Sequence, residues 1–321
     1  MRLATRNNGT PDGELILVSA DGARCMPAGP QSPTLLATLE QWDVARPALH
    51  AVAACLAAGE GEPLDPATLR APLPRTWQWL DGSAFPTHGE LMQQAFNLPP
   101  IETDKPLMYQ GMSHQFLAPA EDAPFPSAAD GIDFEGEFGV VTGAVPMGCS
   151  AEEALAHVRL VVLINDWSLR TIAPVEMKTG FGWVQAKPAC SVAPFAVTPD
   201  ELGDAWRDGR ACLPLTVTVN GAWFGSPNGS AMAYGFHELI AHAARTRSLP
   251  AGTIIGSGTV SNANHAEVGS TCISERRAIE KIAHGEFRTG FLGEGDRVAM
   301  QVGEDAAHFG RIDQRVRLTT G

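Results

Sequence analysis

The 321-residue chain is 44% hydrophobic and 18% charged, a composition typical of an ordered globular protein with a substantial core, in one large domain or two modest ones. Its formal net charge of -13 disfavours nucleic acids and anionic membrane surfaces as partners, because either polyanion would be repelled over most approaches. Small molecules and other proteins remain as the expected partners.

The six cysteines are scattered, without the C-x-x-C spacing of a metal knuckle or a redox pair, so we expect reduced thiols. The N-terminal sequence MRLATRNNGTPDG contains no apolar signal region. No run approaches the roughly 20 apolar residues that a membrane span requires. The sequence therefore predicts a cytoplasmic protein.

Residues 1–85 are predicted to form a small α+β domain. ELILVS, residues 14–19, is a compact β-strand run, and the apolar spacing over 34–59 predicts helix. Prolines are frequent from 60 to 86, which is typical of a linker or an extended cover. We expect residues 86–125 to form a linker and a candidate active-site lid.

A second, catalytic domain is predicted over residues 105–321. Ser150 and Glu153 have the spacing of a capping box for a short helix. Apart from Arg159, the run from 158 to 164 is apolar and rich in β-branched residues, so it is expected to be a strand buried on both faces that ends at Asn165 and Asp166.

The rest of this domain is predicted to be rich in strands. LPLTVTVNGAWFG alternates around Asn220-Gly221, which indicates a hairpin, and GFHELIAHAARTRSLPAG is an amphipathic helix stopped by Pro250 and Gly252. Strand patterns return in residues 292–318. Few helices among many strands favour a β-rich α+β fold, a roll or sandwich, over a doubly wound sheet.

Three carboxylates alternate along DFEGEFGVV, residues 133–141: Asp133, Glu135 and Glu137. In a strand these side chains share one face, and Phe134 and Phe138 share the other, which we expect to be core. Burying like charges without a partner is costly, so arginine, water or a cation must face them. A solvated or arginine-paired face is one interpretation, and a hard divalent cation is the other, because Mg²⁺ and Ca²⁺ prefer oxygen ligands.

Asp166 favours the cation. A carboxylate at the end of a buried apolar strand is unusual for a core, and it would supply the third ligand that a site on two glutamates lacks. Zinc is disfavoured because no His or Cys lies at comparable spacing.

Five motifs, taken in order, resemble the fumarylacetoacetate hydrolase family: E-x-E in DFEGEFGVV, NDWSLR, the lysine of QAKPACSVAPFAVT, VNG, and GSGTVSN. The resemblance covers about residues 105–318. It implies a mixed β-roll catalytic domain, usually in a homodimer, and one shared site. The implied site consists of Glu135, Glu137 and Asp166 as ligands of Mg²⁺, Ca²⁺ or Mn²⁺, Asp133 just outside them, Lys187 as the active-site lysine, and Arg170 and Thr259 as substrate contacts.

Tyr109 lies five residues before His114, the spacing at which hydrolases of this family have a substrate-binding tyrosine and the catalytic histidine. His114 is therefore the predicted general base. The tyrosine-containing hydrolases place a fourth ligand, an aspartate, before that tyrosine, but this chain has Leu107 there. Three protein carboxylates and water would then hold the ion.

Two further departures concern the residues around the substrate. Three residues after Arg170 the family often has glutamine, whereas this chain has Ala173, so part of the oxyanion-stabilising set is missing or is supplied by Glu176. The glutamate that orients the histidine is best matched by Glu275 in STCISERR, two positions out of register. A surface salt bridge with a neighbouring arginine is the alternative role for Glu275.

The resemblance thus implies a metal-dependent hydrolase that cleaves a C–C bond of a β-diketo acid, of the fumarylacetoacetate, fumarylpyruvate or acylpyruvate type, in aromatic or small-acid catabolism. Decarboxylation, isomerisation or dehydration of a 2-oxo acid at the same site is an alternative, because it needs the enolate but no activated water. A remote alternative is a binding protein on the same fold that has no turnover.

Overall fold

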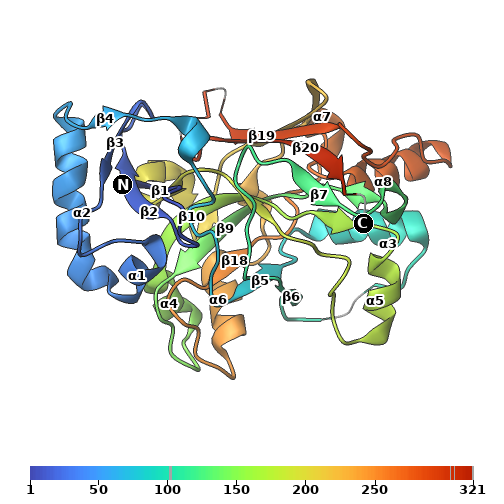
Figure 1. The fold of residues 1–321 in the computed structure, drawn as a ribbon. Coiled ribbons are helices and arrows are strands. Elements are labelled where there is room, and N and C mark those ends of the chain that lie inside the picture. Colours follow the sequence, from blue (N-terminus) through green and yellow to red (C-terminus); the bar gives the residue numbers. More distant parts are fainter. Residues whose placement is uncertain (101–102, 304, 307, 320–321) are drawn as a thin grey trace.

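The computed structural model of the protein describes residues 1–100, 103–303, 305–306 and 308–319. These residues form the expected α+β fold, with two main sheets. Figure 1 shows α1 and α2 with the N-terminal strands at one end of the molecule, and α3, α5 and α8 at the other. Within the described ranges, no helix is long and apolar enough to cross a membrane.

The larger sheet has eleven strands among the described residues and continues from the N-terminal module into the rest of the chain. Its order is β4-β3-β2-β1-β13-β10-β9-β18-β5-β6, with β12 beside β10. The module joins through β1, which pairs with β13 at Arg2 and Leu3. The strands are β1 (Arg2–Arg6), β2 (Glu14–Val18), β3 (Arg24–Pro27), β4 (Glu62–Pro63), β5 (Trp79–Gly82), β6 (Met108–Gly111), β9 (Gly136–Thr142), β10 (Val158–Asn165), β12 (Ser191–Val192), β13 (Ala196–Val197) and β18 (Ile254–Gly256).

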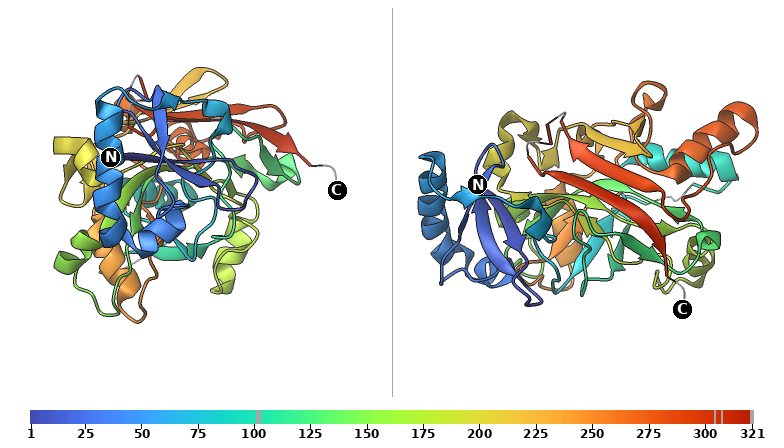
Figure 2. Two further views of the ribbon diagram at one scale, coloured as in Figure 1. Left: turned by 60° about the vertical axis from the view of Figure 1, so that its left-hand side comes forward. Right: turned by 45° about the horizontal axis from the view of Figure 1, so that its top comes forward.

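The second main sheet has the order β17-β16-β19-β20-β7, and Figure 2 shows its long strands β19 and β20 side by side in red. Two short ribbons pair β8 with β11 and β14 with β15. The strands are β7 (Ala123–Phe125), β8 (Ile132–Asp133), β11 (Ser168–Leu169), β14 (Trp206–Arg207), β15 (Arg210–Ala211), β16 (Leu215–Val219), β17 (Ala222–Gly225), β19 (Arg297–Val302) and β20 (Arg311–Leu318).

The helices lie around these sheets, and α3 packs against α8 at the end of the molecule opposite α2 (Figure 1). Ser150 and Glu153 make the predicted capping box at the start of α4. The helices are α1 (Leu35–Glu40), α2 (Trp42–Ala57), α3 (Pro86–Phe96), α4 (Ala151–Ala154), α5 (Ala173–Thr179), α6 (Phe236–Ala244), α7 (His265–Val268) and α8 (Ile273–His284).

Most predicted elements have counterparts in the structure. The helix expected over 34–59 is divided at Gln41 into α1 and α2, the apolar run 158–164 is the buried strand β10, and the hairpin turns at Asn220-Gly221 between β16 and β17. The helix expected to continue toward Pro250 ends at Ala244, because Leu249 is buried in a β-bridge with Val145.

The carboxylate segment is two strands rather than one. β8 ends at Asp133 and pairs with β11, whereas β9 begins at Gly136 and pairs with β10, so the chain changes partners across Phe134 and Glu135. Phe134 and Phe138 are buried in the main core, as the alternating pattern predicts.

The segment 86–125, expected to be a linker and lid, contains α3, β6 and β7. Helix α3 rests on α8, and β6 pairs with β5 as an end strand of the larger sheet. β5 itself begins at Trp79, ahead of the predicted domain boundary at 85, and pairs in parallel with β18. The lid role of the segment stays a prediction.

Candidate active site and metal centre

The candidate site lies where neighbouring strands of the larger sheet bring carboxylates together. Asp81 is on β5, Glu137 is on β9, and Asp166 follows β10 directly. Strand β18 runs between β5 and β9, and its Gly256 is paired with Asp81. A Cβ at Gly256 would collide with the carboxylate oxygens of Asp81 and Glu137, so glycine lets the two acids approach each other across β18.

Asp81, Glu137 and Asp166 form a buried cluster in which one carboxylate oxygen of each lies within 4.8 Å of the others. Neither oxygen of Glu137 has a hydrogen-bond partner. Burial, followed by the charge of Asp166, raises the pKa of Asp81 to about 8. Burial, followed by the charge of Asp81, raises the pKa of Glu137 well above its ordinary value. Three crowded oxygen ligands, of which only Asp166 is ion-paired, fit a hard divalent cation.

Glu135 lies beside this cluster but faces two cationic side chains. Its Oε1 accepts a hydrogen bond from Lys187 Nζ at 3.0 Å and lies 2.7 Å from Arg170 Nη2, and its Oε2 accepts from the Thr259 hydroxyl at 2.8 Å. Burial alone would raise the pKa of Glu135, but the charges of Lys187 and Arg170 outweigh it and hold that pKa below its ordinary value. Two of the three predicted metal ligands thus lie in the cluster, and the third lies next to it.

Asp166 connects the cluster to Tyr109, Lys187 and Cys190. Its Oδ2 accepts hydrogen bonds from Tyr109 Oη and Lys187 Nζ, both at 2.6 Å, and its Oδ1 accepts from Cys190 Sγ at 2.9 Å. Tyr109 is on β6, four strand positions from β10, which would be about 19 Å away in a flat sheet. The sheet therefore curls around the site, and this curl is the predicted roll.

His88 and Glu275 form a second set of titratable side chains, next to each other. His88 Nδ1 lies 3.0 Å from Glu275 Oε2, which joins the first turn of α3 to the first turn of α8. Glu275 is fully buried, while the His88 side chain is 19% exposed. The carboxylate favours a proton on Nδ1, so that Nε2 is the nitrogen able to accept a proton from a substrate or from water.

The structure pairs Glu275 with His88 and not with the predicted base His114. His114 is exposed in the bend after β6, outside the contacts described above, because the chain leaves the sheet after Gly111. Tyr109, the other residue of the predicted pair, does reach the site.

Asp81 and His88 were missed by sequence reasoning, although a signal was present. The spacing used above, with an aspartate two residues before a tyrosine and a histidine five residues after it, also occurs at Asp81, Ser83 and His88. That stretch keeps the aspartate and the histidine and replaces the tyrosine with serine. The other match, at Tyr109, keeps the tyrosine and the histidine, so each of the two stretches matches the spacing only in part.

Asp133 joins the arginine of the site to helix α8. Its Oδ2 accepts hydrogen bonds from Arg170 Nε at 2.8 Å and from the Ser274 N–H at 2.9 Å, and its Oδ1 accepts from the Ile273 N–H at 2.7 Å. A carboxylate at a helix N-terminus is stabilised by the free N–H groups there. Asp133 is fully buried, so one side chain fixes both Arg170 and the helix that carries Glu275.

Glu176 holds a loop in the structure, and its predicted contact with substrate stays a prediction. Its carboxylate accepts hydrogen bonds from the backbone N–H groups of Val184, Gln185 and Ala186, just ahead of Lys187. These bonds lower the pKa of Glu176. These hydrogen bonds fix the backbone that leads to the lysine.

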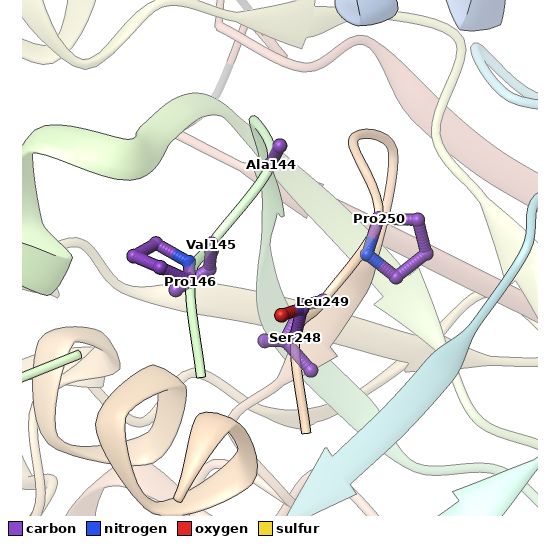
Figure 3. A pocket seen from close by; sticks show the side chains of 6 residues that line it. All are labelled: Ala144, Val145, Pro146, Ser248, Leu249 and Pro250. Atoms are coloured by element: carbon purple, nitrogen blue, oxygen red, sulfur yellow. The ribbon is translucent and has the colours of Figure 1, made fainter. Parts of the chain in front are cut away.

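An open pocket of about 510 Å³ lies elsewhere, past the far end of β9 (Figure 3). The side chains that line it carry no group for acid–base or metal chemistry: Ala144, Val145, Pro146, Ser248, Leu249 and Pro250. The carboxylate cluster, rather than this pocket, is the candidate site.

Comparisons with known proteins agree with this architecture. The family model of the fumarylacetoacetate (FAA) hydrolase C-terminal domain matches residues 78–317, and that of the fumarylacetoacetase N-terminal domain 2 matches residues 1–75. A solved structure, the 5-carboxymethyl-2-hydroxymuconate delta-isomerase of Mycobacterium smegmatis, has the same fold over 100% of both chains, with a TM-score of 0.63 and 17% sequence identity.

Curated relatives include enzymes of two kinds. The chain is 31% identical to 2,4-didehydro-3-deoxy-L-rhamnonate hydrolase of Sphingomonas sp. strain SKA58 over 50% of this chain and 54% of that protein. It is 25% identical to oxaloacetate tautomerase FAHD2B, mitochondrial, of Homo sapiens, over 48% of each. The chain thus spans about half the length of these relatives. Because the two family models together match most of its length, the chain belongs to the fumarylacetoacetate hydrolase family.

Proposed function

We propose that this protein is a divalent-metal-dependent hydrolase that cleaves a C–C bond of a β-diketo acid, of the fumarylacetoacetate, fumarylpyruvate or acylpyruvate type. The observation that carries the proposal is the pairing of His88 with a buried glutamate, together with a buried cluster of three carboxylates of which only Asp166 has a cationic partner. A base and a cation site in one place are what metal-assisted hydrolysis requires.

Asp81, Glu137 and Asp166 would hold the ion, and Glu135 could add a fourth oxygen through Oε2. Mg²⁺ is the expected ion, with Ca²⁺ and Mn²⁺ as alternatives that take the same ligands. When bound, the ion would act as a Lewis acid toward the carboxylate and 2-oxo oxygens of the diketo acid and would stabilise enolate charge.

The residues of the chain would carry out the proton transfers. His88 Nε2 takes a proton from water, and the resulting hydroxide adds to the carbonyl carbon farther from the carboxylate. The C–C bond to the central carbon then breaks, and its electron pair stays on that carbon as the enolate of a 2-oxo acid. Lys187 and Arg170 supply positive charge to the developing oxyanion. Protonation of the enolate completes a carboxylic acid and a 2-oxo acid.

The second candidate is tautomerisation or decarboxylation of a 2-oxo acid at the same site. The match to an oxaloacetate tautomerase supports it. Tautomerisation removes a proton from carbon and adds one to the enolate oxygen, whereas decarboxylation releases CO2 and protonates the enolate at carbon. Both reactions pass through the enolate, and neither consumes water. His88 would then move a proton at carbon instead of activating water.

The deciding experiment follows an acylpyruvate panel and oxaloacetate by the ultraviolet absorbance of the enol form. Metal-stripped enzyme, enzyme with Mg²⁺ and the Glu137→Gln variant are compared, with Glu152→Gln on an exposed position of α4 as the control. Metal-dependent loss of the acylpyruvate band with release of two acids, absent in Glu137→Gln and present in the control, supports the hydrolase. Consumption of oxaloacetate alone would support the second candidate.

The family resemblance makes a homodimer the expected assembly. Light scattering of the purified chain would give a mass near twice 34.0 kDa if the proposal is right and near 34.0 kDa if it is wrong. Participation in aromatic or small-acid catabolism follows only if the diketo acid is identified.

A further inference from the structure

Two aromatic rings surround the lysine of the site. The rings of Tyr109 and Trp183 are 4.9 Å apart between centroids and meet edge to face at 63°. Lys187 Nζ lies 5.3 Å from the centre of the first ring and 5.5 Å from the centre of the second. We propose that Tyr109 and Trp183, the aromatic wall, bind the acyl end of the substrate and select planar apolar groups such as an aromatic acyl chain. This inference rests on the proposed hydrolase function.

The aromatic wall contacts the carboxylate cluster directly, through Tyr109. Tyr109 donates its hydroxyl hydrogen to Asp166, a member of the cluster, and Lys187 donates to the same oxygen. His88 lies on the side of Glu135: it is paired with Glu275 on α8, and Asp133 joins the start of α8 to Arg170, which contacts Glu135. A diketo acid held at the cluster would therefore have the base on one side and the aromatic wall on the other.

The charges around the aromatic wall favour an apolar group over a second carboxylate. The two buried cations of the site already have anionic partners, Arg170 on Asp133 and Glu135, and Lys187 on Glu135 and Asp166. A further carboxylate on the substrate would compete with these pairs. A flat apolar group would instead gain from burial against the rings and from edge-to-face contacts.

The segment that carries Trp183 is apolar and held in place. Met177, Phe181 and Val184 on this segment are 59%, 97% and 82% exposed, which is unusual for large apolar side chains. The Glu176 carboxylate binds three successive backbone N–H groups directly after Trp183. Trp183 is thus presented on backbone that is already ordered, which reduces the entropy lost when a ligand binds.

The position of Tyr109 is specific to this arrangement of strands. Tyr109 is paired with Asp81 across β5 and β6, so a cluster carboxylate and the ring of the wall face each other in register. The spacing discussed above leaves Ser83, a small side chain, where a tyrosine would follow Asp81 in the chain. Tyr109 therefore brings a phenol to the site from the neighbouring strand.

The test compares acetylpyruvate with benzoylpyruvate in wild type, Trp183→Ala and Tyr109→Phe, with the exposed Trp223→Ala as the control. In Trp183→Ala we expect kcat/KM for benzoylpyruvate to fall about 10- to 30-fold, mainly through KM, and that for acetylpyruvate to change by less than about threefold. Tyr109→Phe keeps the ring and loses the bond to Asp166, so both substrates should lose activity by a similar factor. Equal losses for both substrates in Trp183→Ala would overturn the proposal.

A binding measurement separates this inference from the proposed reaction. Benzoate and acetate, the acids that hydrolysis would release, are titrated into the protein with Mg²⁺ and pyruvate, and binding is followed by ligand-detected NMR. We expect benzoate to bind about tenfold more tightly than acetate, and Trp183→Ala to abolish the difference. If wild type consumes neither diketo acid but keeps this preference, the hydrolase proposal fails and the aromatic wall stands. Equal binding of benzoate and acetate would overturn the proposal that the aromatic wall binds the acyl end of the substrate.

Discussion

Glu135 and Glu137 lie two residues apart in the same segment, yet their surroundings are opposite in charge. Glu135 is paired with Lys187 and Arg170, and its pKa is lowered. Glu137 has no hydrogen-bond partner, faces Asp81, and its pKa is raised. The comparison shows that two carboxylates close together in the sequence can reach one site, but the segments packed around each of them decide which one is neutralised. Glu137, the carboxylate that no cationic side chain neutralises, is the one suited to an external cation.

The largest effect is expected when Glu137, the carboxylate without a hydrogen-bond partner, is changed. Glu137→Gln should abolish Mg²⁺ binding and lower kcat/KM about a thousandfold, or ~4 kcal/mol, because the amide removes an anionic ligand. Glu135→Gln should weaken Mg²⁺ binding by only about tenfold, since it mainly disturbs the pairs with Lys187 and Arg170. Calorimetric Mg²⁺ titrations of both variants make the comparison. Stronger loss of Mg²⁺ affinity in Glu135→Gln than in Glu137→Gln would reverse the assignment.

The next effect separates the two histidines. His88→Ala should lower kcat about 100- to 1,000-fold with Mg²⁺ affinity retained, because it removes the proton acceptor without touching a ligand. His114→Ala, at an exposed position, should change kcat by less than about threefold. Steady-state kinetics of both variants decide between the base predicted from the sequence and the base that contacts Glu275. The reverse pattern would restore His114 as the base.

A smaller effect is expected at Asp133, which links Arg170 to the start of helix α8. Asp133→Asn should lower kcat about 10- to 100-fold, because the amide cannot accept at both oxygens from Arg170 and from the N-terminus of α8. Arg170 and Glu275 would then be held less firmly, so the pH profile of kcat should change together with kcat. An Asp133→Asn protein with lower thermal stability but an unchanged pH profile and kcat would show that Asp133 is only structural.

The smallest effect concerns stability in the absence of metal. The folded-state pKa of Asp81, about 8, lies above its ordinary value of 3.8, so the folded protein retains a proton that the unfolded chain releases. The resulting destabilisation is absent below about pH 4 and grows as the pH rises toward 8. In EDTA, Asp81→Asn should therefore match wild type near pH 4 and unfold several degrees higher near pH 8. Thermal scans at both pH values test this, and a constant difference would contradict it.

Sequence reasoning found the fold class and part of the site, for identifiable reasons. The β-branched run of β10 and the turn residues Asn220-Gly221 are local signals, and the structure contains both elements. Glu137 and Asp166 could be grouped because they belong to ordered motifs. Asp81 and His88 come from the stretch read as linker, and they join the site only through the parallel pairing of β5 with β18 and the packing of α3 on α8.

Pairings between distant segments leave no local periodicity, which is why these two residues were missed. Two stretches of the chain match the Asp/Tyr/His spacing in part, one at Asp81 and His88 and one at Tyr109 and His114. Which of their residues reach the cluster depends on the pairing of the strands, and no single stretch of sequence contains that information. Glu176 shows the same limit, since its place in the sequence gives no sign of the three backbone hydrogen bonds that it accepts.

The unbroken sheet that runs from β4 to β6 has a consequence for how the molecule unfolds. Because β1 is hydrogen-bonded to β13, removing residues 1–75 would turn β13 into an open sheet edge and uncover the apolar side chains beneath α2. The two parts matched by separate family models are thus expected to melt in one cooperative transition, and the catalytic part expressed alone is expected to aggregate.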